Sequence, residues 1–147
     1  MTATGHAIIG TVIAAKIGNP ALAIPLAFVS HIAADLVPHW DVGTNRRFKT
    51  KKKMRVQAAL DVIISFALSY LLIVFLFPTT NLLYAFVIII AAQAPDWLMT
   101  PYYFFGVKQF KWAYEFGKKT NKELDKPWGI IYQVVVLLAV VVLGLLI

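Results

Sequence analysis

The chain has no cysteine and few charges. The absence of cysteine among its 147 residues excludes disulfide bonds and thiolate metal sites. Charged residues make up 14% of the chain, whereas a soluble globular domain has about 25%. Hydrophobic residues make up 60%, more apolar surface than a water-soluble chain of this size could bury in one core. Composition therefore excludes an ordinary soluble domain and predicts a single membrane domain over residues 1–147.

A basic region before the first apolar stretch is also missing. The chain opens with MTATGHAIIG and carries a histidine where a secretory signal has lysine or arginine. We therefore expect the first apolar segment to be part of the folded protein.

Five apolar segments are separated by turns or basic stretches. They cover approximately residues 4–17, 21–37, 56–77, 82–99 and 129–147. The first two are shorter than the roughly 20 residues that a crossing helix needs, and Gly18-Asn19-Pro20 predicts a turn between them. Residues 102–128 mix aromatic residues with lysines, which is typical of an amphipathic helix lying at the lipid headgroups with a polar loop after it. The predicted fold is an all-α integral membrane protein with four or five membrane-embedded helices, the first two short and hairpin-like, plus an amphipathic interfacial helix.

Positive charge is concentrated in two stretches. Of fourteen lysines and arginines, seven lie in residues 46–55 and six in residues 108–126. The positive-inside rule places both stretches in the cytoplasm. Counting crossings from them predicts a multi-pass protein of the cell inner (cytoplasmic) membrane, with a cytoplasmic N-terminus and an external C-terminus. We expect the basic stretches to contact anionic membrane lipids, and we expect no nucleic-acid partner.

Seven ionisable residues lie in or beside the apolar segments. They are His6, His31, His39, Asp35, Asp41, Asp61 and Asp96. An ionisable group in a membrane segment costs free energy unless it is paired, metal-bound or hydrated, so it indicates a functional site by default. The predicted topology brings all seven to the cytoplasmic boundary of the membrane.

Several of these residue types are metal ligands. His31 and Asp35 are four residues apart and share one helical face, and His39 continues that row if the helix passes Pro38. Imidazole nitrogens with carboxylate oxygens suit zinc, manganese or iron. We expect a divalent metal, zinc or manganese, with the ligands His6, His31, Asp35, His39 and Asp96. A surplus carboxylate, Asp61 or Asp96, is a candidate general base or second-metal ligand. The candidate catalytic residues are Asp61 and Asp41.

Two motifs resemble a known family. The opening MTATGH and residues 30–35, SHIAAD, resemble the MTAxGH and SHxxAD motifs of the YdjM-like family of inner-membrane metal-dependent hydrolases. The resemblance implies that His6, His31 and Asp35 are metal-site residues. Pro95-Asp96 resembles part of the PDxDH motif of that family, although residues 97–99 replace the rest and the HRGxTHS motif is missing.

These patterns predict a membrane-embedded metal-dependent hydrolase whose His/Asp site opens at the cytoplasmic interface, acting on a lipid or lipid-linked phosphoester. The alternative is a non-enzymatic membrane protein, either a metal or proton transporter or a scaffold. In a scaffold the polar residues would only join helices, with hydrogen bonds worth about 0.6 kcal/mol on average. A transporter should carry its ionisable groups near the bilayer midplane, whereas here they gather at one edge.

Overall fold

The computed structural model describes residues 1–147 and contains no β-strand. Its six helices are α1 (Ala3–Lys16), α2 (Pro20–Asp35), α3 (Lys51–Leu76), α4 (Leu82–Phe105), α5 (Lys111–Thr120) and α6 (Trp128–Leu146), with two 3-10 turns, η1 (Arg46–Phe48) and η2 (Lys108–Phe110). Helices α3, α4 and α6 are long and apolar enough to cross a membrane, and α2 is a shorter apolar helix. The predicted fold class, an all-α membrane protein, is confirmed.

The first two helices form a short hairpin. The side chain of Thr2 accepts a hydrogen bond at the start of α1, and Asn19 does the same for α2, where Pro20 occupies the first helical position. At about 1.5 Å per residue, these 14 and 16 residues extend about 21 and 24 Å. The hydrocarbon layer is about 30 Å thick. The hairpin therefore covers only part of that thickness.

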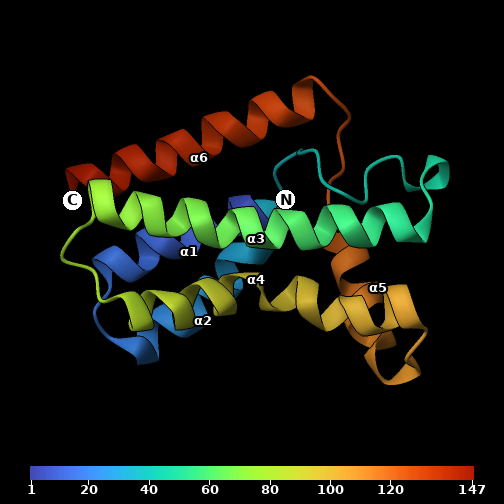
Figure 1. Ribbon diagram of the computed structural model, residues 1–147, viewed down its shortest axis with the longest axis horizontal. Helices are drawn as coiled ribbons and strands as arrows, with labels where there is room; N and C mark the ends of the chain where they lie inside the picture. Colours follow the sequence, from blue (N-terminus) through green and yellow to red (C-terminus); the bar gives the residue numbers. More distant parts are fainter.

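The two ends of the molecule differ in charge (Figure 1). The α1–α2 turn, the α3–α4 turn and the C-terminus lie at one end, on the left, while residues 46–55 and α5 lie toward the other end. The N-terminus lies near the middle of the long axis. Lys16 at the end of α1 is the one lysine or arginine at the turns, so the arrangement separates nearly uncharged turns from the basic segments, as a membrane topology requires.

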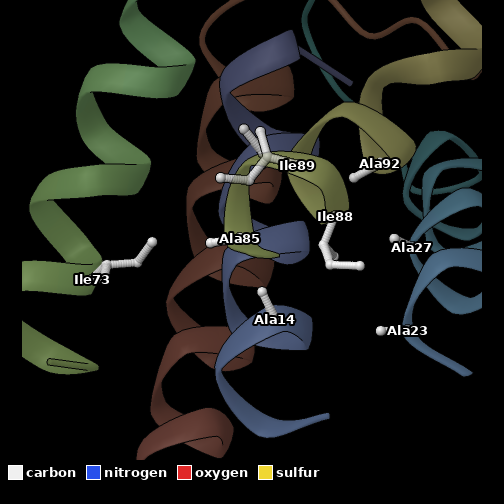
Figure 2. Close-up of a cluster of buried hydrophobic side chains, with 9 residues drawn as sticks. Ala14, Ala23, Ala27, Ile73, Ala85, Ile88, Ile89 and Ala92 are labelled. Atoms are coloured by element: carbon white, nitrogen blue, oxygen red, sulfur yellow. The ribbon is translucent and has the colours of Figure 1, made fainter. Parts of the chain in front are cut away.

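Small side chains hold the hairpin against α4 (Figure 2). The main buried cluster consists of Ala7, Ala14, Ala23, Ala27, Ile73, Ala85, Ile88, Ile89 and Ala92. A Cβ atom added to Gly10 would lie 2.9 Å from the Cβ of Ala92 and 3.3 Å from the Cα of Ile89. Small residues let helix backbones approach closely, and this packing replaces the hydrophobic driving force that helices lack in lipid.

Some helix boundaries differ from the sequence-based expectation. Helix α3 begins at Lys51, because the side chain of Thr50 caps its first turn, so it includes much of the basic stretch. Helix α4 continues beyond residue 99 and contains Pro95 and Pro101, since membrane helices tolerate proline where neighbouring groups satisfy the freed backbone. It ends at Gly106, whose φ of 73° is a common helix terminator. The interfacial helix is correspondingly shorter than residues 102–128.

Candidate metal centre

Three helices bring ligand atoms to one point. His6 lies in the first turns of α1, His31 near the end of α2, and Asp96 in α4. One ligand atom from each of these residues lies within 4.8 Å of the other two. Both histidines are buried and Asp96 is partly exposed. The structure therefore joins three of the five metal ligands predicted from the sequence.

The carboxylate of Asp35 lies among the imidazole rings. Its Oδ1 is 3.2 Å from the Nε2 of His6, and its Oδ2 is 3.3 Å from the Nε2 of His31. The Nε2 of His31 is also 3.6 Å from the Oδ1 of Asp96. Helix α2 ends at Asp35, but His39 still returns to the same place, with its Nε2 3.8 Å from the Oδ1 of Asp35. All five predicted metal ligands thus lie in one cluster.

Backbone carbonyls fix the orientation of two rings. The Nδ1 of His31 is 2.7 Å from the carbonyl oxygen of Ala92, and the Nδ1 of His39 is 2.7 Å from that of Val37. A carbonyl oxygen only accepts hydrogen bonds, so each Nδ1 carries the proton and donates it. In the neutral ring Nε2 then has a free lone pair, directed at the carboxylates. This is the tautomer that carbonyl partners impose on metal-binding histidines.

Several buried nitrogens in the cluster have no hydrogen-bond partner. Neither ring nitrogen of His6 makes a hydrogen bond, and neither does the Nε2 of His39. The 3.2 Å approach of His6 to Asp35 is close, but it lacks hydrogen-bond geometry. An unsatisfied buried polar group costs about 1–3 kcal/mol. A cation placed among these nitrogens would remove that cost.

The spacing of the ligand atoms suits a small divalent ion. Ligands about 2.0–2.2 Å from a tetrahedral zinc ion lie about 3.3–3.6 Å from one another. The distances from His6 and His31 to the two carboxylates are 3.2, 3.3 and 3.6 Å. The rings of His6 and His31 stack at 3.6 Å with an interplanar angle of 12°. The α-ammonium of Met1 also contacts Asp35, so a positive charge already lies against this carboxylate.

Asp61 contacts the start of α1. Its Oδ2 accepts a hydrogen bond from the backbone N–H of Ala3 at 2.7 Å, and its Oδ1 accepts from the Thr4 hydroxyl at 2.6 Å and the Thr4 backbone N–H at 3.2 Å. These are N–H groups that a helix start leaves without partners. Asp61 therefore positions the helix that carries His6. Its predicted role as a catalytic base stays a prediction.

Asp41 lies in the loop after α2, with its Oδ2 3.6 Å from the Nε2 of His39. It accepts hydrogen bonds from the backbone N–H of Thr44 at 2.8 Å and from the side-chain amide of Asn121 at 2.9 Å. Burial alone would raise the pKa of Asp41, but the contact with His39 holds this pKa well below its usual range. Asp41 is therefore an ionised carboxylate beside the cluster, and its predicted catalytic role is untested.

Three polar residues that support the cluster were not predicted from the sequence: Asn121, Glu123 and Gln133. Burial and the charge of Asp41 raise the pKa of Glu123. Gln133 of α6 accepts a hydrogen bond from the backbone N–H of Thr2 at 3.1 Å. Asn121 and Glu123 lie in a polar loop without periodicity, where the sequence offers no signal. Gln133 interrupts an otherwise apolar helix, which is a usable signal.

Two cavities flank the cluster. The first, here called the polar cavity, has a volume of about 440 Å³ and a mixed lining, in which charged residues stand beside apolar ones such as Met54 and Trp97; the charged residues include Asp96, Asp41, Asp61, Arg46 and Lys118. The second has a volume of about 450 Å³, reaches His31 and Asp35, and is otherwise lined mainly by apolar side chains of α2, α4 and α5, among them Phe28, Leu98, Trp112 and Phe116. The metal ligands are therefore reached from a polar side and from an apolar side.

Met99 and Gly117 line both cavities. A Cβ atom on Gly117 would overlap the sulfur of Met99, so only glycine lets this side chain lie across α5. A flexible thioether thus lies where the two cavities adjoin.

Comparisons with models of known protein families, with curated proteins and with solved structures found no match. Fold and site define the class as an all-α membrane protein with a buried His/Asp cluster that could hold a metal. The resemblance to the YdjM-like family stays an expectation based on its two motifs.

Proposed function

We propose that the protein is a membrane-embedded metal-dependent hydrolase. The observation that carries the proposal is the group formed by His6, His31 and Asp96, three ligand residues from separate helices with ligand atoms within 4.8 Å of one another. With Asp35 they offer two imidazole nitrogens and two carboxylates, a set that suits zinc or manganese. A helix-bridging role would need one or two such groups, not four at one point.

A divalent metal at such a site polarises a phosphoryl or carbonyl oxygen and acidifies a water molecule. The protein's own residues orient the ligands and receive the proton. The carbonyl of Ala92 fixes the ring of His31, and Asp61 fixes the start of α1. The proposed proton acceptor is one of the two carboxylates that line the same polar cavity as Asp96, namely Asp61 or Asp41.

The two cavities support an amphiphilic substrate. Arg46 and Lys118 offer cationic partners for an anionic headgroup such as a phosphoester, on a wall that also carries Asp41, Asp61 and Asp96. The second cavity, with Trp112 and Phe116 in its wall, favours a hydrocarbon chain. The ligand cluster is reached from both cavities. A lipid or lipid-linked phosphoester is therefore the proposed substrate class.

We further propose that the site faces the cytoplasmic side of the inner membrane. The support is the basic segment at residues 46–55 together with the lysines of α5, both toward the same end of the molecule (Figure 1). A hairpin about 21–24 Å long, starting at the opposite surface, ends roughly 6–9 Å inside a hydrocarbon layer of about 30 Å. A headgroup would then need to enter by about that depth.

The test is an isosteric change at Asp35. Asp35→Asn removes one ligand charge with little change in shape, and Glu115→Gln on the exposed surface removes a charge outside the cluster. Each purified protein is equilibrated with micromolar zinc or manganese in detergent, dialysed and submitted to elemental analysis. A soluble phosphodiester and a phospholipid vesicle then serve as substrates. We expect metal and hydrolysis in the wild type and in Glu115→Gln, and neither in Asp35→Asn.

A wild-type protein that stays metal-free would overturn the proposal. It would favour the scaffold alternative, in which the contact between Asp35 and the α-ammonium of Met1 meets the charge requirement of the cluster without a metal.

A further inference from the structure

We infer that the cluster holds a second divalent cation, between His39 and Asp41, and that Asp35 is shared by both cation positions. The inference rests on the proposed function, because it needs the first metal beside His6 and His31. It adds a separate binding position, built from residues outside the group formed by His6, His31 and Asp96.

The first support is the unpartnered nitrogen of His39. This side chain is completely buried, and its Nδ1 donates to the carbonyl of Val37. Its Nε2 has no hydrogen-bond partner and, in the neutral ring, carries a free lone pair. Two carboxylate oxygens lie near it, the Oδ2 of Asp41 at 3.6 Å and the Oδ1 of Asp35 at 3.8 Å. A lone pair facing two carboxylates without a proton or a cation between them is unfavourable.

The second support is the backbone that holds His39 in place. Its N–H donates to the carbonyl of Lys122 at 3.1 Å, and its carbonyl accepts from the N–H of Leu124 at 2.7 Å. The N–H of Lys122 in turn donates to the carbonyl of Asp35 at 3.0 Å. The loop after α2 is thus paired with the segment after α5. The ring position is fixed by main-chain hydrogen bonds, as a binding site requires.

The third support is the carboxylate of Glu123, which lies near that of Asp41. A Cβ atom on Gly43 would lie 3.2 Å from the Oδ1 of Asp41 and 3.5 Å from the Oε1 of Glu123. Two carboxylates therefore face the same small residue at the edge of the polar cavity, which all three residues line. A cation at His39 and Asp41 would also be attracted by Glu123.

Asp35 is placed to serve both positions. Its Oδ1 faces the Nε2 atoms of His6 and His39, one from each position, and its Oδ2 faces the Nε2 of His31. The α-ammonium of Met1 contacts the same Oδ1, so cation binding there would have to displace it. A carboxylate between two ligand sets is the usual bridge in two-metal sites, whose ions are about 3.5–4 Å apart. Such pairs hold both the attacking and the leaving oxygen of a phosphoryl displacement. A second cation therefore favours a phosphoester over a carboxylic ester as the substrate.

Manganese alone is a sufficient probe. We would load the full-length protein in detergent with Mn²⁺, remove unbound ions, and measure ions per chain together with the electron paramagnetic resonance spectrum. We expect two ions per chain with the spectrum of an exchange-coupled pair in the wild type. Asp41→Asn should retain one ion with an uncoupled spectrum, and Asp125→Asn, an exposed carboxylate in the neighbouring loop, should retain the coupled pair.

The outcomes separate the two proposals. One uncoupled ion in the wild type overturns the second position and leaves the proposed function standing. No ion in the wild type overturns both. Two ions that stay coupled in Asp41→Asn, or that are uncoupled in the wild type, also overturn the shared position. If Asp41→Asn does not fold, the wild-type ion count and coupling decide alone.

Discussion

Helices α1, α2 and α4 pack in two different ways along their length. Toward the uncharged end they are joined by alanines and by Gly10, with isoleucines of α3 and α4 filling the gaps (Figure 2). Toward the basic end the same helices carry His6, His31, Asp35 and Asp96, and neither ring nitrogen of His6 has a hydrogen-bond partner. The close-packed half supplies the stability that lets the polar half keep unsatisfied ligand atoms, a division common at functional sites.

The largest loss of stability is expected from a substitution that disrupts packing in the close-packed half. Gly10→Leu would push into Ala92 and Ile89 of α4, and overpacking of this kind costs about 1–3 kcal/mol or more. We expect a strongly lowered unfolding temperature in detergent and, because α1 carries His6, loss of metal binding. Gly18→Leu is the matched control, since nothing lies within 4 Å of a Cβ there. If Gly18→Leu lowers the unfolding temperature as much as Gly10→Leu does, the close packing at Gly10 is not what stabilises this half of the molecule.

A smaller effect is expected where the two halves meet. Asp61→Ala removes the acceptor of the Ala3 and Thr4 hydrogen bonds, and the loss of such a helix cap costs about 1 kcal/mol. Because this cap positions His6, we expect metal affinity to fall by roughly 10-fold, the lower range for residues that orient ligands. Isothermal titration with zinc and thermal unfolding measure the two effects. If hydrolysis disappears while metal affinity is unchanged, Asp61 is instead a catalytic base, as the sequence predicted.

The smallest effect is expected in the polar loop. The folded-state pKa of Glu123 is raised, so ionisation of this residue destabilises the fold at neutral pH. Glu123→Gln should therefore raise the unfolding temperature of metal-free protein at pH 7 by about 1 °C. The gain should vanish as the pH falls below the ordinary pKa of glutamate, because both side chains are then neutral. A gain that is equal at pH 7 and pH 4 would argue against this electrostatic origin.

Sequence analysis found the helices and most of the cluster, because both leave regular signals. Apolar segments of defined length predict membrane helices, and a histidine or aspartate within them stands out against the background. His31 and Asp35 share a helical face, so their proximity followed from spacing alone. The position of His39 beside Asp35 could not be predicted from spacing, because it depends on hydrogen bonds between the loop after α2 and residues 122–124.

Other features lay beyond sequence patterns for physical reasons. Helix α4 continues through Pro95 and Pro101, which local rules treat as terminators, because tertiary packing overrides them. The role of Asp61 depends on where α1 begins relative to α3, and the cavities depend on how α5 lies against α4. Such relations involve pairs of segments far apart in sequence, for which a single chain gives no periodic signal.

The side chain of Met99 at Gly117 has a consequence for ligand length. A molecule that occupies both cavities at once would lie against this thioether, which has rotatable bonds and no hydrogen bond to hold it. The conformer of Met99 would then contribute to the size of the molecule that fits. We expect short amphiphiles to fit beside one conformer of Met99 and longer ones to select another. The preference for chain length would then depend on the equilibrium between these conformers.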